Sequence, residues 1–340
     1  MVVGVPDGTG TATSGPKVIT AAPDEGGSAA AVGQNGDVFV DGSAFAGGSA
    51  EPAPASGLAA ATGKPWGAPI PFTTNEPVPD KLIFILTAGS DARPGEDLLR
   101  TRADSIHLLC VNPATGQGTL LGFPRDSWVE IPGRGRAKVN AAYSWGGPAL
   151  LVGTVEKLTG VRVDHFAVID FAGFRSVVDA IGGVDVGVAA PTSSAGVAFQ
   201  AGMNHLDGDA ALVYVRQRHE LAGGDLARAA RQQNVLRAVL GKLVGVDVFR
   251  RLAFLAALTR SVSVDATLTN SGLRLLAFDV RPQQVVFLTA PVRGAGSEGG
   301  QSVVLLDDAS AAALWAALRS GTAAAYAQQH PDALLGPAPA

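Results

Sequence analysis

Residues 82–126 read LIFILTAGSDARPGEDLLRTRADSIHLLCVNPATGQGTLLGFPRD, and the expected fold follows from this stretch. Short apolar runs occupy residues 82–87, 106–111 and 119–123, and turn residues bound each of them. Runs of this length between turn residues are typical of buried strands. Asp and Arg gather where the runs begin and end, and strand ends are where ligands bind in open α/β sheets. We therefore expect an α/β domain with a ligand site at this sheet edge.

The sequence beyond this stretch continues to alternate between helical and strand-like patterns. Helices are expected over residues 148–158, 171–181, 208–216, 226–243, 249–258, 272–278 and 309–318. Further strands are expected over residues 165–170, 184–186, 285–288 and 303–306. Residues 187–206 are expected to be irregular, and Asp225 is expected to cap the long helix that follows it.

Charge and composition divide the chain into a linker and a domain. Residues 1–80 hold two basic and eight acidic side chains, whereas the rest of the chain holds 24 basic and 22 acidic ones. Residues 1–78 are rich in Gly, Ala, Ser, Thr and Pro, and we expect a low-complexity, disordered or extended linker there. Residues 79–320 are expected to form a single domain, and the Ala- and Pro-rich residues 321–340 a frayed tail.

The totals argue against several classes of protein. The near balance of basic and acidic side chains in the domain argues against a nucleic-acid partner, which requires a strongly basic surface. The single cysteine, Cys110, excludes an internal disulfide and a paired-cysteine metal site. The sequence shows no run of the ~18 apolar residues that a membrane span needs. It also shows no export signal at its start, so no membrane anchor is visible in it.

Two carboxylates and three basic side chains surround the first three predicted strands. They are Asp91, Arg102, Asp104, Arg125 and Lys138. Asp in such a turn is often only a capping residue, and an Arg–Asp pair is often a structural salt bridge. Two carboxylates at strand ends, each close to an arginine, favour instead a divalent metal held by Asp and a phosphate held by Arg. Oxygen ligands of this kind favour Mg²⁺ or Mn²⁺ over zinc.

A second polar cluster accompanies the two helices expected over 208–216 and 226–243. Its members are Arg216, Arg218, Asp225, Arg228, Arg231 and Gln232. On a helix, Arg228, Arg231 and Gln232 are three and four residues apart, so they share a face beside the apolar stripe. The planar guanidinium fork suits phosphate oxygens. This cluster therefore predicts a second group of phosphate ligands, whose spatial relation to the first group the sequence does not fix.

The order of the polar motifs is more specific than any one of them. The motifs are GSDAR (89–93), RAD (102–104), FPRDSWVEIPG (123–133), KVNAAYSWGGP (138–148), DHFAVIDFAGF (164–174), IGGVDV (181–186), LDGDAALVYVRQRH (206–219) and GDLARAARQQ (224–233). Together they closely resemble the LytR–CpsA–Psr family of bacterial cell-wall proteins from about residue 81 to about residue 242, with a looser fit to about residue 320.

The resemblance implies a fold, an activity and a set of site residues. The fold is a single α/β domain with a central mixed β-sheet flanked by helices and a polyprenyl-lipid pocket between sheet and helices. The activity is Mg²⁺-dependent transfer of a glycopolymer, of the arabinogalactan, teichoic acid or capsule type, from a polyprenyl-pyrophosphate carrier to peptidoglycan through a phosphodiester. By motif position, Asp91 and Asp104 are the metal ligands, and together with Arg102 and Arg125 they are the catalytic residues. The residues implied to bind the pyrophosphate are Arg102, Arg125, Lys138, Arg216, Arg218, Asp225, Arg228, Arg231 and Gln232.

The resemblance also implies partners and a location. The expected partners are the lipid-linked glycan, the peptidoglycan acceptor and, through the lipid carrier, the membrane surface. The expected location is the extracytoplasmic face of the cell membrane. Two alternatives stay open: a pyrophosphatase, in which water replaces the acceptor sugar, and a non-catalytic polyprenyl-phosphate-binding regulator of the envelope.

Overall fold

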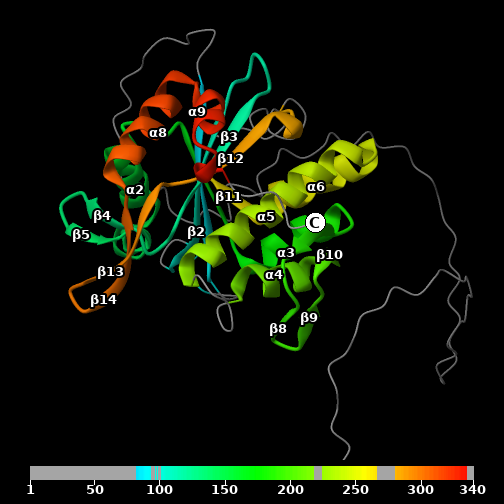
Figure 1. The fold of residues 1–340 in the computed structure, drawn as a ribbon. Helices are drawn as coiled ribbons and strands as arrows, with labels where there is room; N and C mark the ends of the chain where they lie inside the picture. Colours follow the sequence, from blue (N-terminus) through cyan, green and yellow to red (C-terminus); the bar gives the residue numbers. More distant parts are fainter. Residues whose placement is uncertain are drawn as a thin grey trace, which may run out of the picture.

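The computed structural model describes residues 82–92, 96, 98, 101–217, 224–265 and 280–334. The predicted linker over 1–78 and the predicted helix over 272–278 lie outside these residues. The described chain forms a mixed α/β fold in which one central sheet lies between two groups of helices, as the sequence predicts (Figure 1).

The central sheet has the strand order β11-β6-β1-β2-β3-β12. Its strands are β1 (Ile83–Ser90), β2 (Ala103–Val111), β3 (Gly118–Phe123), β6 (His165–Ile169), β11 (Val262–Val264) and β12 (Val285–Thr289). β2 is antiparallel to β1 and to β3, whereas β6 is parallel to β1 and β12 is parallel to β3. Because Ser90 pairs with Ala103, the residues that follow β1 and begin β2 lie at one end of the sheet.

Helices cover both faces of the sheet, and short two-stranded sheets lie outside it. The helices are α2 (Val139–Thr159), α3 (Phe171–Ala180), α4 (Gly208–Arg216), α5 (Gly224–Gly245), α6 (Val248–Ser261), α8 (Asp308–Ser320) and α9 (Ala323–Gln329), with 3₁₀ turns η2 (Pro282–Gln284) and η3 (Pro331–Ala333). The two-stranded sheets pair β4 (Trp128–Ile131) with β5 (Gly135–Lys138), β7 (Val184–Val188) with β10 (Gly202–Leu206), β8 (Thr192–Ser194) with β9 (Val197–Phe199), and β13 (Val292–Glu298) with β14 (Gln301–Leu306).

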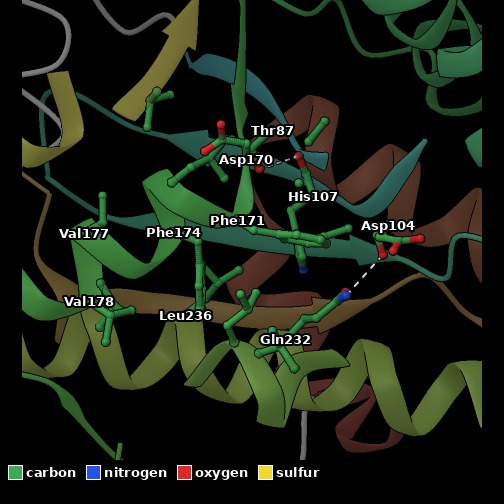
Figure 2. Close-up of a pocket in the computed structure, with 18 of the residues that line it drawn as sticks. Thr87, Asp104, His107, Asp170, Phe171, Phe174, Val177, Val178, Gln232 and Leu236 are labelled. Carbon is green, nitrogen blue, oxygen red and sulfur yellow. Dashed lines mark hydrogen bonds between the residues drawn. The ribbon is translucent and has the colours of Figure 1, made fainter. Parts of the chain in front are cut away.

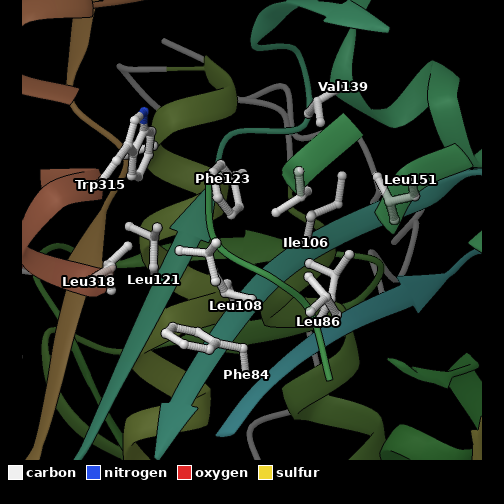
Figure 3. Close-up of a cluster of buried hydrophobic side chains, with 14 of the residues drawn as sticks. Phe84, Leu86, Ile106, Leu108, Leu121, Phe123, Val139, Leu151, Trp315 and Leu318 are labelled. Atoms are coloured by element: carbon white, nitrogen blue, oxygen red, sulfur yellow. The ribbon is translucent and has the colours of Figure 1, made fainter. Parts of the chain in front are cut away.

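One face of the central sheet is filled by apolar side chains. Leu86 of β1 and Leu108 of β2 are fully buried there, among side chains from α2, α8 and α9 (Figure 3). Phe123 of β3 lies against Trp315 of α8, with 5.9 Å between ring centroids. Successive residues of a strand point to opposite faces, so the residues between these core positions face the second layer of helices.

The second layer, formed by α3, α4, α5 and α6, has an apolar core of its own. Val178 of α3 and Val235 of α5 are fully buried in it. α3 and α6 approach closely at Gly173, where a Cβ atom would lie 2.6 Å from the carbonyl oxygen of Ser261. Because these helices pack on one another, they do not depend on the sheet to bury all their apolar surface. This packing leaves room between the two layers.

The structure differs from the sequence-based expectation at the C-terminal end of the domain. Residues 321–340 were expected to fray, but residues 323–329 form α9, and Tyr326 is buried in the core. The Tyr326 ring stacks on His330, with 4.2 Å between ring centroids. Alanine has the highest helix propensity, so an Ala-rich segment that carries one large aromatic side chain can dock as a helix.

Three further expectations need correction. Residues 187–206 were expected to be irregular, but they contain β8, β9 and β10. α2 begins at Val139 rather than at Pro148, and the non-helical backbone of Gly146 and Gly147 introduces a kink within it. The long helix begins at Gly224, so Asp225 lies inside it rather than before its first residue. Short strands with few apolar residues carry a weak periodic signal, which explains the first of these errors.

We predict that two Gly→Ala substitutions change stability in opposite directions. A Cβ atom at Gly122 of β3 would lie 2.0 Å from Nε2 of Gln233, a buried side chain that donates to the carbonyl oxygen of Leu288. Gly122→Ala should therefore lower the free energy of unfolding by about 1–3 kcal/mol. Gly153 of α2 has open space at the same position, so Gly153→Ala should raise it by about 0.5–1 kcal/mol. Urea unfolding measures the free energy of unfolding of both variants. An equal change in the two variants would contradict the contact between Gly122 and Gln233.

Candidate functional site

A cavity of about 1260 Å³ separates the sheet from the helices on its second face. Its sheet side is lined by residues that alternate with the core positions, such as Ile85 of β1 and His107 of β2. Its helical side is lined by α3, α4, α5 and α6, with Phe174 and Leu236 among the lining residues (Figure 2). The cavity is therefore the space that the second layer leaves open.

The cavity is polar at one end and apolar at the other. Asp91, Asp104 and Arg216 line the end where β1 finishes and β2 begins. Leu120 and Val285 line the opposite end, where β3 and β12 begin. This distribution matches an elongated ligand with a charged head and an apolar tail.

Asp91 is fixed at the end of β1 by the backbone of Arg102. Arg102 N donates to Asp91 Oδ1 at 3.0 Å, and Asp91 N donates to the carbonyl oxygen of Arg102 at 3.2 Å. The Asp91 side chain is half-buried and lines the cavity, whereas the Arg102 side chain is exposed and is not among the lining residues. The structure therefore brings Asp91 into the site and gives Arg102 a backbone contact with it.

Asp104 belongs to a chain of alternating charges. Arg125 donates from Nη1 to Asp104 Oδ1, and its Nε lies 3.8 Å from Asp126 Oδ1. Lys138 Nζ lies 3.3 Å from the same Asp126 oxygen. The Arg125 and Asp104 side chains are only 15% and 18% exposed, so solvent screens this pair less than a surface ion pair. The predicted residues Asp104, Arg125 and Lys138 thus form one network.

The β4–β5 hairpin explains how Lys138 returns to this network. Trp128, two residues after Asp126, pairs with Lys138 across the hairpin. Gly133 and Gly135 have φ angles of 69° and 78° near the turn, in the region that favours glycine. The hairpin was not predicted from the sequence, although the IPGRG segment that contains both glycines is a turn signal.

α5 supplies the second group of predicted ligands. Gln232 donates from Nε2 to the carbonyl oxygen of Asp104 at 3.1 Å, which joins α5 directly to the start of β2 (Figure 2). Arg228 is 5% exposed and lines the cavity. Arg231 contacts α4 instead: it donates to the carbonyl oxygen of Gln217 at 3.4 Å, and its guanidinium carbon lies 5.8 Å from the centroid of the Tyr214 ring. The two predicted groups therefore meet at Asp104.

The end of α4 carries Arg216 to the same region. Its guanidinium carbon lies 4.4 Å from the centroid of the Phe171 ring, and the side chain lines the cavity. Arg218 lies outside the described residues, as does the side chain of Asp225. Of the predicted site residues, the structure gathers seven at the polar end, directly or through ion pairs. These are Asp91, Asp104, Arg125, Lys138, Arg216, Arg228 and Gln232.

His107 lines the cavity but was not singled out from the sequence. It is 3% exposed, and burial lowers the pKa of its imidazole to about 4. Ser105 Oγ lies 3.0 Å from His107 Nδ1, in a hydrogen bond between residues on the cavity face of β2. Because His107 alternates with the core residues Ile106 and Leu108, the sequence could have placed it on the opposite face of β2. The sequence could not have shown that this face borders a cavity.

The donor set at the polar end fits a divalent cation only in part. Among the described residues, no group of three or more His, Cys, Asp or Glu side chains lies close enough to hold a metal ion. Asp91 and Asp104 both line the cavity at adjoining strand ends. Mg²⁺ is commonly bound by one or two carboxylates together with water and substrate phosphates. These two residues therefore suit a cation that the ligand helps to bind.

The geometry can be compared with known proteins. A family model, described as the LytR_cpsA_psr family, matches residues 64–320. The chain belongs to the LytR–CpsA–Psr family. Over 252 residues it is 37% identical to a protein named probable cell wall biosynthesis protein LcpB from Corynebacterium glutamicum, and the match covers 69% of this chain and 60% of that protein.

A second relative in the LytR–CpsA–Psr family carries the name of an enzyme. Over 161 residues the chain is 39% identical to the polyisoprenyl-teichoic acid–peptidoglycan teichoic acid transferase TagU of Bacillus mycoides, covering 47% of this chain and 52% of that protein. The matches thus span less than two thirds of the length of both relatives.

Solved structures of LytR–CpsA–Psr proteins share the fold. The TagV structure from B. subtilis has a TM-score of 0.61 and 25% identity, covering 72% of this chain and 98% of that one. A structure described as TagT bound to LIIa-WTA has a TM-score of 0.59 and 27% identity, covering 72% of this chain and 93% of that one. No helix in the described part of the chain combines the length and apolar character that crossing a membrane requires.

We predict that His107 makes stability depend on pH in weak acid. The folded state holds the imidazole neutral down to pH ~4, whereas the unfolded chain takes up a proton near pH 6.5. Stability is therefore fully present above about pH 6.5 and falls as the pH drops toward 4, by about 2 kcal/mol between about pH 7 and about pH 5. His107→Gln should lose this part of the pH dependence in urea unfolding. An unchanged slope in that variant would show that His107 titrates in the folded state.

Proposed function

We propose that this protein transfers a glycopolymer, as its phosphate ester, from a polyprenyl-pyrophosphate carrier to a hydroxyl group of peptidoglycan. One observation carries the proposal: an apolar cavity of about 1260 Å³ ends at a cluster of arginines and carboxylates. A polyprenyl chain requires the first part and a pyrophosphate requires the second. The names of the relatives LcpB and TagU support the same assignment, as does a family structure bound to wall teichoic acid.

The apolar end of the cavity would hold the lipid. Leu109, Leu120, Leu236 and Leu240 line it from both layers. Burying an apolar chain in such a space contributes roughly 0.8 kcal/mol for each methylene group removed from water. The sheet and the helices on the two sides of the cavity have separate apolar cores. Neither layer therefore has to unfold for the cavity to hold a lipid tail.

The polar end would hold the pyrophosphate. Arg228 is buried beside the cavity, Arg216 lines its rim, and Arg125 lies behind Asp104. Guanidinium groups fixed by stacking and ion pairs are oriented before the ligand arrives, and such orientation is a main source of electrostatic catalysis. When bound by Asp91 and Asp104 with the phosphates, Mg²⁺ would supply further positive charge against the pyrophosphate oxygens.

The proposed reaction is a displacement at the phosphorus atom that bears the glycan. The oxygen of the acceptor hydroxyl forms a bond to this phosphorus, and the bond from phosphorus to the bridging oxygen of the pyrophosphate breaks. Polyprenyl phosphate leaves with that oxygen, and the hydroxyl proton passes to a base. The arginines stabilise the negative charge that develops on the leaving group. The reaction would take place at the extracytoplasmic face of the cell membrane, where peptidoglycan is accessible.

The first test of this proposal uses a short lipid-pyrophosphate-linked glycan, a peptidoglycan oligomer and Mg²⁺. We expect a joined product, and Asp104→Asn should lower its rate by at least about 100-fold because it removes the charge that orients Arg125 and binds the cation. Far-ultraviolet circular dichroism should show that the variant remains folded.

The matched control is Glu130→Gln, which removes an exposed carboxylate that pairs with Lys157. It should retain the wild-type rate. Release of phosphorylated glycan without joined product would indicate a pyrophosphatase instead. Binding of the donor without either product would indicate a lipid-binding regulator.

A second prediction tests the lipid site separately from the chemistry. Leu240 of α5 lines the cavity and contacts the apolar cluster that contains Val285 and Phe287. Leu240→Trp should narrow the apolar end, because the larger side chain occupies space that a long tail needs. We expect KM for a long-chain donor to rise about tenfold or more, while KM for a donor with a short tail changes little. Equal changes in KM for the long-tailed and short-tailed donors would show that the tail binds outside the apolar end of the cavity.

A further inference from the structure

An apolar surface lies at the corner between α5 and α6. Seven large apolar side chains are exposed in the described part of the chain, and four of them fall between residues 244 and 252. These are Val244, Val248, Phe249 and Leu252, which we call the corner patch. Phe249 is 79% exposed and Val248 is 57% exposed. Exposed apolar side chains that cluster in this way commonly mark a binding surface.

The corner patch lies at the apolar end of the cavity. α5 runs from the polar end, where Gln232 contacts Asp104, toward the apolar end, where Leu243 is one of its last lining residues. Val244 follows Leu243 directly. α6 then runs back, because β11, which follows it, pairs Val262 with Ile169 at the polar end of β6. The turn between the two helices is therefore at the far end from the charged groups, about 25 Å along α5 from Arg228.

The charges around the corner patch are mostly positive. The basic side chains between residues 242 and 252 are Lys242, Arg250 and Arg251. The acidic groups beside them are Asp247 and, on β7, Asp185, whose Oδ2 lies 3.2 Å from Lys242 Nζ. Asp247 caps α6 by accepting a hydrogen bond from the backbone of Arg250. This local excess contrasts with a net charge of −4 for the whole chain. Basic side chains beside exposed aromatic and aliphatic ones are the pattern of helices that lie on anionic bilayers.

We propose that the corner patch docks the domain on an anionic lipid bilayer, with the apolar end of the cavity facing the lipid. Phe249 and Leu252 insert among the acyl chains, and Arg250 and Arg251 contact the lipid head groups. This orientation lets a polyprenyl tail pass from the bilayer into the cavity without crossing water, while the charged end faces away from the membrane. The docking of the patch rests on the exposure of its apolar side chains and on the charges beside them. The passage of the tail rests on the proposed function.

The test measures binding of the full chain to vesicles of phosphatidylglycerol and phosphatidylcholine, against vesicles of phosphatidylcholine alone. We expect binding to the anionic vesicles, and Phe249→Glu with Leu252→Glu should weaken it by at least about tenfold. The matched control is Ala313→Glu with Ala316→Glu, which adds the same charges at the same spacing on the exposed face of α8. The control should bind as the wild type does.

Transfer assays separate this proposal from the proposed function. With a water-soluble short-tailed donor, the Phe249→Glu, Leu252→Glu variant should turn over at the wild-type rate, which also shows that it is folded. With a long-tailed donor embedded in anionic vesicles, its rate should fall about tenfold or more. Vesicle binding without any transfer would remove the proposed function and leave the docking surface in place.

Three results would overturn the docking proposal. The first is equal vesicle binding by the corner variant and the wild type. The second is no binding of the wild type to anionic vesicles. The third is a wild-type dimer in sedimentation that the corner variant loses while vesicle binding is unchanged, because a second copy of the chain would then cover the patch.

Discussion

The pairing of β1 with β2 is the interaction on which the rest of the structure depends. Its antiparallel register, with Ser90 opposite Ala103, places Asp91 and Asp104 at one end of the sheet. The register shifts between Gly89 and Ser90, and this irregularity lets the backbone of Arg102 bind the Asp91 carboxylate. The same pairing sets which side chains face each layer of helices. A slip of one residue would turn the core face toward the cavity and separate the carboxylates from their partners.

The hollow face of the sheet persists because the helices above it are stabilised independently. An empty apolar space forfeits dispersion contacts, so a layer that relied on the sheet alone would collapse onto it. Here α3, α4, α5 and α6 share a core with β7 and β10. Polar contacts also set the distance of α5 from the sheet: Gln232 reaches the backbone at Asp104, and Gln233 reaches the backbone at Leu288. Two adjacent glutamines of α5 thus join the helical layer to two strands of the central sheet, β2 and β12.

The sequence predicted the parts of this structure that local patterns control. The bounds of α4, Gly208–Arg216, agree with prediction because Asp207 caps the helix through the backbone N–H of Ala210. β1, β2 and β3 were placed to within a few residues because their apolar runs are continuous. That same continuity hid the cavity, since a run that is mostly apolar on both faces does not reveal which face is filled. The contact between Gln232 and Asp104 could not be predicted from local patterns either, because 128 residues separate the two in the chain.

The charge network suggests distinct roles for its two carboxylates. Asp104 lines the cavity, whereas Asp126 does not, although both lie beside Arg125. Asp126 also lies near Lys138, so one carboxylate is shared between two cations that reach it from different sides of the β4–β5 hairpin. A partly buried carboxylate in that position keeps two long basic side chains oriented, which reduces the conformational entropy they would otherwise lose on binding an anion. Under the proposed function, Asp126 is a positioning residue and Asp104 is the carboxylate that faces the ligand.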